Sequence, residues 1–207
     1  MLADQSVRDL LAAFGSPAPT PGGGSASALA SAIGASLLLM VAGLPRTRSG
    51  SEEDRSVLES AAAELTGLRD QLTGAIDADA AAYDQVVAAY KLPKASSEEQ
   101  LARKAAIQRA LRAATDVPLS VMRLSSSALD RAATVAVHGH RAAASDVGVA
   151  VALLRAGIQG ARLNIDINVG SVSDAVYVDA TRAEADRLSE RAAHAADAAD
   201  AASTSTA

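Results

Sequence analysis

The chain of 207 residues contains no cysteine and no tryptophan, and only 2% of its residues are aromatic. Without cysteine there is no disulfide and no thiolate metal site. A core made largely of Ala, Leu and Val cannot fill wide gaps, so its elements must approach one another closely. Helices with small faces can do this, whereas strands favour β-branched and aromatic residues. The composition therefore predicts an all-α protein.

The sequence also has no concentration of positive charge. Its formal net charge is −5 at pH 7, with acids and bases interspersed, and it lacks the basic stripe of a nucleic-acid-binding surface. Asp4, Arg8 and Asp9 precede any apolar run, which is unlike a secretory signal peptide. We therefore expect a soluble cytoplasmic protein that binds no nucleic acid, with residues 1–207 forming one domain.

The longest run without any charge extends from Leu10 to Leu44. A membrane span needs about 20 apolar residues, so length alone permits one. Ser25, Ser27, Ser31 and Ser36 interrupt the run, however, and prolines and glycines open it. We expect a helix buried on all sides and no membrane association. Ala26, Ala30 and Gly34 recur at every fourth position, which lets a second helix approach from the same chain or from a partner subunit.

Apolar residues at spacings of three and four predict a compact bundle of about six to nine helices, one of them long. The long helix is expected from Glu52 to Tyr90 and is ended by Pro93. The capping-box sequence Ser97–Gln100 opens the next helix, and Asp116–Pro118 is expected to end it and to start another. The other expected helices are Ser6–Phe14, Ser25–Gly43, Leu119–Val137, Ser145–Val169 and one after Gly170, with residues 203–207 frayed.

The stretch from Pro19 to Leu29 combines two prolines, three glycines and two serines. Its two prolines fix the backbone, and Gly22–Gly24 leave a turn without side chains, so another molecule or backbone can come into contact. Ser25 or Ser27 can cap the helix that follows, and the free N–H groups of its first turn favour negative charge or a carbonyl. No Lys follows the glycines, so this is not a nucleotide loop. A tight turn packed against a neighbouring helix is the alternative.

A few polar residues fall on apolar helix faces or near helix ends. Asp79 lies on the apolar stripe of the long helix, where a carboxylate must be paired, hydrogen-bonded or lining a site. Asn164 and Asn168 are one turn apart, and buried asparagines need partners. His138 and His140 are two residues apart and have no evident third ligand, so no metal site is expected.

The stretch Pro19–Leu29 resembles the signature of the folate cyclodeaminase/cyclohydrolase family. This family includes the C-terminal domain of formiminotransferase-cyclodeaminase and stand-alone methenyltetrahydrofolate cyclohydrolases. Further blocks resemble the family in order along residues 5–180: Asp79–Ala89, Leu92–Lys94, Ala106–Gln108, Ala114–Leu119, Ser145–Ala150, Leu163–Asn164 and Ile167–Asn168. The chain departs from the family at Leu44–Gly50, where a Gly-Lys-Lys-x-Tyr-like segment is usual, and at Gly139-His140, where Gly-Asn is usual.

The resemblance implies an all-α homodimer that binds a tetrahydrofolate derivative between helices, with no metal and no further cofactor. We expect a methenyltetrahydrofolate cyclohydrolase, which hydrolyses 5,10-methenyltetrahydrofolate to 10-formyltetrahydrofolate, because the chain carries no formiminotransferase domain. A formimidoyltetrahydrofolate cyclodeaminase, which releases ammonia, is the first alternative. A non-catalytic folate-binding or structural helical dimer is the second.

The same resemblance implies a set of site residues. Asp79 is expected to be the catalytic acid/base and to stabilise the cationic substrate, with Tyr83 orienting its ring system. Contacts to the folate are expected from Pro21, Gly22, Gly23, Gly24 and Ser25, the last four through backbone donors. Asp146, Asn164 and Asn168 would shape the pocket. The candidates for binding the folate's glutamate tail are Arg46, Arg48 and Lys94, with a solvated loop as the alternative.

Overall fold

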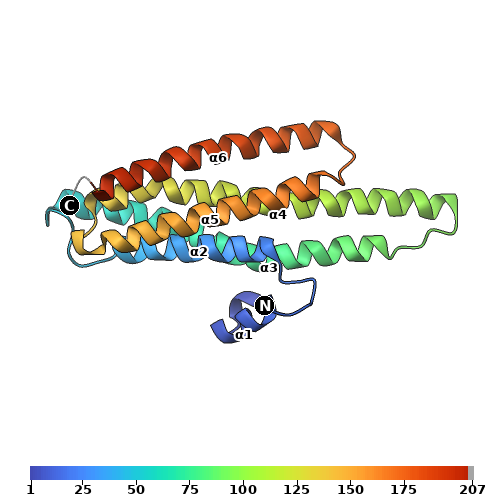
Figure 1. The fold of residues 1–207 in the computed structure, drawn as a ribbon, viewed down its shortest axis with the longest axis horizontal. Helices are drawn as coiled ribbons and strands as arrows, with labels where there is room; N and C mark the ends of the chain where they lie inside the picture. Colours follow the sequence, from blue (N-terminus) through green and yellow to red (C-terminus); the bar gives the residue numbers. More distant parts are fainter. Residues whose placement is uncertain (205–207) are drawn as a thin grey trace.

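The protein is a bundle of long α-helices, seen here in a computed structural model that describes residues 1–204 (Figure 1). In chain order the elements are η1 Leu2–Asp4, α1 Val7–Phe14, α2 Gly23–Ala42, α3 Glu52–Tyr90, α4 Ser97–His138, η2 Arg141–Ala143, α5 Ala144–Val169 and α6 Ala175–Thr204. No strand occurs among these residues, which confirms the all-α prediction. Ser203 and Thr204 are still helical, and the rest of the tail predicted to fray, 205–207, lies outside the described residues.

Helix α4 runs straight through Pro118, where the sequence predicts a break. A proline has no N–H to donate to the carbonyl four residues earlier, which here belongs to Ala114. The side-chain amide of Asn168, on α5, donates to that carbonyl instead, with 2.9 Å between Nδ2 and the oxygen. The helix therefore continues to 42 residues, and together with α3, of 39 residues, it gives the bundle two long helices rather than one.

Helices α2 and α5 pack antiparallel with almost no space between them. A Cβ added to Gly157 on α5 would lie 1.9 Å from the Ser31 hydroxyl oxygen and 2.8 Å from the Ser27 carbonyl oxygen of α2. A Cβ added to Gly34 on α2 would lie 2.8 Å from a side-chain carbon of Leu154. Of the predicted row, Gly34 therefore makes a close contact with a helix of the same chain, whereas Ala26 is exposed and the other close contacts come from Ser27 and Ser31.

The two helices of this pair are also the most apolar segments of the chain. By length and composition alone, Gly23–Ala42 and Arg141–Val169 could each cross a membrane. Core helices of soluble proteins pass the same test, and 56% of the apolar window of the first segment is buried inside the bundle. The apolar character of α2 is thus largely accounted for by its place between α3 and α5 (Figure 1).

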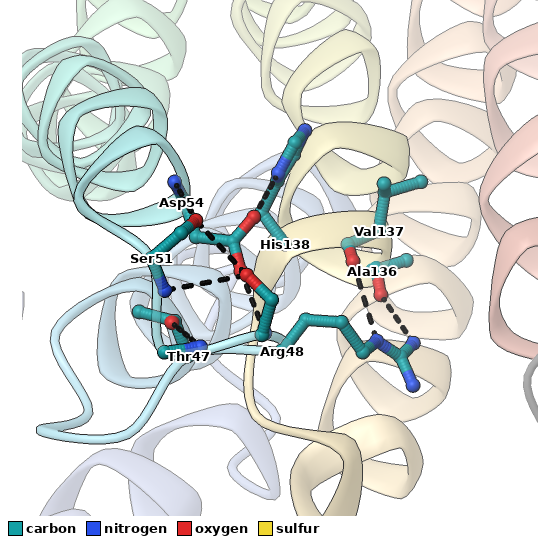
Figure 2. A network of polar contacts seen from close by, with 9 residues as sticks. Thr47, Arg48, Ser51, Asp54, Ala136, Val137 and His138 are labelled. Carbon is teal, nitrogen blue, oxygen red and sulfur yellow. Dashed lines mark hydrogen bonds and ion pairs between the residues drawn. The ribbon is translucent and has the colours of Figure 1, made fainter.

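A polar network joins the loop after α2 to the end of α4 (Figure 2). Asp54, which is 7% exposed, accepts hydrogen bonds from the backbone N–H and the hydroxyl of Ser49, at 2.7 and 2.6 Å. Its other oxygen lies 2.7 Å from Nδ1 of His138, the last residue of α4. The guanidinium of Arg48 donates to two carbonyl groups in the last turn of α4. Arg48 and His138 therefore hold the loop after α2 against the end of α4.

We expect Asp54→Asn to lower the melting temperature at neutral pH and to matter less in acid. Hydrogen bonds from Ser49 and from His138 hold the pKa of Asp54 well below its ordinary value. A depressed folded-state pKa stabilises the fold above the unfolded pKa of ~3.9, and this stabilisation is lost as the pH falls toward the folded value.

The check is a series of melting curves from about pH 7 to about pH 2. The difference in melting temperature between wild type and Asp54→Asn should be largest near neutral pH and should become smaller below about pH 4. Glu53→Gln removes a carboxylate from the same helical turn, but from an exposed position, and should show no such difference. A difference for Asp54→Asn that stays constant into acid would contradict the role assigned to the carboxylate.

Candidate functional site

The glycine turn leads into a helix that has no side-chain cap of its own. Helix α2 begins at Gly23, with Gly22 as its N-cap residue. Asp79 on α3 takes the place of a cap, because its Oδ2 accepts from the Ser25 N–H at 2.8 Å and lies 3.0 Å from the Ser25 hydroxyl oxygen. Ser25 is completely buried. Its N–H, predicted to donate to the folate, therefore holds Asp79 in place instead.

Gly24 allows this carboxylate to come so close. A Cβ at position 24 would lie 2.0 Å from Oδ1 of Asp79 and 2.5 Å from its Cγ, so any side chain there would displace the carboxylate. Oδ1 itself accepts no hydrogen bond from the residues that the structure describes. One carboxylate oxygen is thus fixed by the start of α2, and the other remains available to a ligand.

A cavity of about 320 Å³ lies beside this carboxylate, within the size range of small-molecule sites. Its walls come from the glycine turn and from α3, α4 and α5. The lining residues are Pro19, Thr20, Gly22, Gly23, Gly24, Asp79, Tyr83, Val86, Leu111, Ala114, Asn164 and Asn168. The fold therefore brings together seven of the residues predicted from the sequence: Gly22, Gly23, Gly24, Asp79, Tyr83, Asn164 and Asn168. Pro21, which follows a cis peptide bond, borders the turn but does not line the cavity.

The two asparagines reach the cavity from successive turns of α5. Asn164 donates to the carbonyl of Gly160 at 2.8 Å, and Asn168 donates to the carbonyl of Ala114 across the helix interface. Each amide is oriented by one hydrogen bond, and neither amide oxygen accepts a hydrogen bond from another residue in the 1–204 range. Both side chains are therefore positioned and still have capacity to bind a polar ligand.

Besides Pro19 and Thr20 of the turn itself, three lining residues have no predicted role in the site: Val86, Leu111 and Ala114. Ala114 does leave a signal in the sequence, because it lies four residues before Pro118 and its carbonyl must find another donor. Val86 and Leu111 belong to apolar stripes, and a cavity wall made of such residues has the same pattern as a core. Nothing in the sequence distinguishes these two.

Three predicted residues lie at the other end of the α2–α5 pair. Arg46 and Arg48 follow the C-terminus of α2, and Asp146 is in the first turn of α5. Helix α2 has 20 residues, so at 1.5 Å per residue they are about 30 Å from the glycine turn. Within one chain, therefore, they do not meet Asp79. The predicted helix start at Ser145 is one residue late, since α5 begins at Ala144.

Lys94, in the loop between α3 and α4, lines a second cavity of about 430 Å³. Arg103 and Lys104 are in the same lining, so this cavity is basic. Ile107, also in its wall, is one helical turn before Leu111 of the first cavity. The two cavities thus follow one another along α4. Asp79 lines the first cavity, and the three basic residues line the second. No group of three His, Asp or Glu residues that could hold a metal occurs within residues 1–204.

Known proteins share the sequence of this chain over most of its length. The formiminotransferase-cyclodeaminase family matches residues 6–187. The methenyltetrahydrofolate cyclohydrolase of Methylorubrum extorquens is 39% identical over 92% of this chain and 95% of that protein. The formimidoyltransferase-cyclodeaminase of Dictyostelium discoideum is 35% identical over 92% of this chain but only 35% of its own length. The chain therefore spans about a third of this longer relative.

A solved structure shows the same architecture. The crystal structure of formiminotetrahydrofolate cyclodeaminase from Thermotoga maritima matches with a TM-score of 0.87, covering 99% of this chain and 98% of that chain. The two sequences are 24% identical, so this likeness supports the fold, and the sequence comparisons establish the kinship. On these grounds the chain belongs to the formiminotransferase-cyclodeaminase family.

Proposed function

We propose that the protein hydrolyses 5,10-methenyltetrahydrofolate to 10-formyltetrahydrofolate in the cavity beside Asp79. The observation that carries the proposal is that Asp79 lines a cavity of ligand size and that its Oδ1 accepts no hydrogen bond from any of the residues 1–204. It lies in a chain that is 39% identical to a methenyltetrahydrofolate cyclohydrolase along nearly the full length of both. The substrate and the reaction are inferred from that relative, and the acting group is inferred from the geometry.

The chemistry requires a base next to a cation. The methenyl carbon bridges N5 and N10 of the folate and shares a positive charge with them, which a neighbouring carboxylate stabilises. As water adds to this carbon, Asp79 accepts one of its protons through Oδ1. The carboxyl group then gives that proton to N5, the bond between N5 and the carbon breaks, and the remaining hydroxyl proton goes to solvent. The net reaction consumes one water and releases one proton.

The neighbouring groups match the rest of a folate. Tyr83 is 42% exposed in the cavity wall, where its ring can stack on the flat pterin. Asn164 and Asn168 face the same space and offer amide oxygens to N–H groups of the pterin. The glutamate carboxylates would extend along α4 toward Lys94, Arg103 and Lys104 of the basic cavity, which can pair with them.

A homodimer, expected from the resemblance, is the second part of the proposal. Large apolar side chains remain exposed on the outer faces of α2 and α5, among them Ile33 at 44%, Val149 at 52% and Ile167 at 75%. Surfaces of this kind mark interfaces in soluble proteins. Sedimentation or light scattering should give a mass of two chains.

Formimidoyltetrahydrofolate cyclodeaminase is the second candidate function. It is favoured by the 35% identity to the Dictyostelium enzyme, which carries that activity in its name. Both reactions pass through a tetrahedral carbon between N5 and N10, and both need one proton carrier. The same cavity therefore suits either substrate, and the choice rests on the full-length match to the cyclohydrolase.

Purified protein is expected to speed the loss of methenyl absorbance when given 5,10-methenyltetrahydrofolate. It should release no ammonia from 5-formiminotetrahydrofolate. Ammonia release without methenyl hydrolysis would replace the proposal by the cyclodeaminase. Loss of both signals, with folate still raising the melting temperature, would indicate a binding protein.

A further inference from the structure

We infer that Pro118 is a positioning residue of the folate cavity, because it decides which end of the Asn168 side-chain amide faces the ligand. The NH₂ end of this amide is held by α4, so its oxygen is left as a fixed acceptor for an N–H group of the pterin. This inference rests on the proposed function for its ligand and deepens it. It gives a part in ligand recognition to a buried residue that does not itself line the cavity.

Pro118 lies in the interior of α4, and its side chain is buried. In a regular α-helix the N–H of residue 118 would donate to the carbonyl of Ala114. A proline has no N–H, so this carbonyl needs a donor from outside its own helix. Ala114 also lines the folate cavity. The carbonyl that Pro118 leaves without a helical donor therefore belongs to the wall of the site.

Asn168 of α5 supplies the donor that Ala114 lacks. Its Nδ2 lies 2.9 Å from the Ala114 carbonyl oxygen, in a partly buried contact. The two ends of an asparagine amide are similar in size, so their hydrogen-bond partners decide which way round the amide lies. The reversed amide would set Oδ1 against a carbonyl oxygen and leave both acceptors without a donor, which is costly in a partly buried place. The NH₂ end must therefore face α4.

The other end of the Asn168 amide can only accept. Asn168 lines the cavity, and its Oδ1 accepts no hydrogen bond from another of the residues 1–204. A ligand N–H pairs with this oxygen, whereas a ligand carbonyl or carboxylate is repelled by it. The pyrimidine ring of a pterin carries suitable N–H groups at N3 and at its 2-amino nitrogen. The fixed amide thus favours the ring that the proposed substrate carries.

Asn164, one turn earlier on α5, provides the contrast. Its NH₂ group donates to the carbonyl of Gly160 at 2.8 Å. That carbonyl lies four residues earlier in the same helix, so its regular donor is the backbone N–H of Asn164 itself. Reversing the Asn164 amide would leave no carbonyl without a donor. Both asparagines line the cavity, but of the two only Asn168 has its orientation dictated by a proline.

A double-mutant cycle on stability tests the orientation without any assay of activity. In the wild-type background, Asn168→Leu leaves the Ala114 carbonyl without a donor, and the melting temperature should fall by roughly 4–8 °C. In the Pro118→Ala background, the N–H of residue 118 can donate to this carbonyl, so the same substitution should lower the melting temperature by less than half as much. Because one substitution is compared in two backgrounds, the packing of the leucine itself cancels.

Asn164→Leu is the matched control for the cycle. It removes the same kind of side chain from the same helix and the same cavity, but its carbonyl partner keeps a backbone donor. Its effect on the melting temperature should be the same in the wild-type and Pro118→Ala backgrounds. Equal losses for Asn168→Leu in both backgrounds would overturn the inference. An Asn168→Leu chain that folds only together with Pro118→Ala would support it.

Steady-state kinetics test the effect on the ligand. Pro118→Ala releases the amide from its fixed partner, so KM for 5,10-methenyltetrahydrofolate should rise by roughly 2–10-fold with kcat little changed. Alanine is the best helix former, so this variant should fold. Asn168→Leu should raise KM by roughly 5–100-fold. The double variant should have the KM of Asn168→Leu alone, because Pro118 acts through Asn168. Effects on KM that multiply would overturn the positioning role.

The two measurements separate this inference from the proposed function. Suppose that wild type hydrolyses no methenyl substrate and that 5-formyltetrahydrofolate does not raise its melting temperature, while residues 118 and 168 are coupled in the stability cycle. The proposed function then fails, and Pro118 still orients Asn168. If methenyl hydrolysis is present and the coupling is absent, the inference about Pro118 fails alone.

Discussion

Asp79→Asn is expected to lower kcat for methenyl hydrolysis by about 10²–10⁴-fold while the protein remains folded. The amide oxygen of an asparagine can still accept the Ser25 N–H, so the start of α2 keeps a hydrogen-bond partner. The variant loses the negative charge next to the substrate cation and the ability to carry a proton. Methenyl absorbance gives kcat and KM, and circular dichroism checks that the helices are intact.

Asp84→Asn is the matched control for this prediction. Asp84 is on the same helix, is exposed, and makes no hydrogen bond with another residue in the described chain. Its replacement removes the same charge from the same element, so kcat should be unchanged. If Asp79→Asn also kept full activity, the carboxylate would be a cap of α2 and nothing more.

Gly157→Ala is expected to cause a large loss of stability. The new Cβ would meet the Ser31 hydroxyl at 1.9 Å and the Ser27 carbonyl at 2.8 Å. The hydroxyl can rotate, but the carbonyl belongs to the backbone of α2, so the two helices must separate. We expect a loss of about 3 kcal/mol, a typical upper value for overpacking, and a melting temperature lower by about 6–12 °C.

Gly67→Ala provides the opposite case in the same protein. Gly67 is exposed in the interior of α3, and nothing lies within 4 Å of a Cβ built there. An alanine is a better helix former than a glycine by up to about 1 kcal/mol, so this variant should melt slightly higher. The melting temperatures of both variants, compared with that of wild type, test these two expectations. Equal effects would mean that α2 and α5 are not in close contact.

The helices could be predicted from the sequence because their causes are local. Apolar spacing and the stop at Pro93 place α3 at its observed bounds, and the glycines after Pro21 mark the turn before α2. The break predicted at Pro118 is wrong because the donor that replaces the missing proline N–H is not close in the sequence. The donor that satisfies the Ala114 carbonyl is Asn168, 54 residues further along the chain.

The candidate site could be predicted in part for the same reason. Asp79 stands out because a carboxylate on an apolar stripe needs a partner, and the structure supplies that partner in Ser25. Which predicted residues share one end of the bundle cannot be read from their order along the sequence. Arg46 follows α2 and Asn168 is in the last turn of α5, but the first lies far from the cavity and the second lines it.

The capping of α2 by Asp79 also fixes the orientation of the Asp79 carboxylate. The oxygen that we propose acts on the substrate and the oxygen that caps the helix belong to one rigid carboxylate group. Any drift of the reactive atom would uncover the first turn of α2, so the folded chain resists it before a substrate arrives. The carboxylate is therefore already oriented in the protein without ligand, and ligand binding need not orient it.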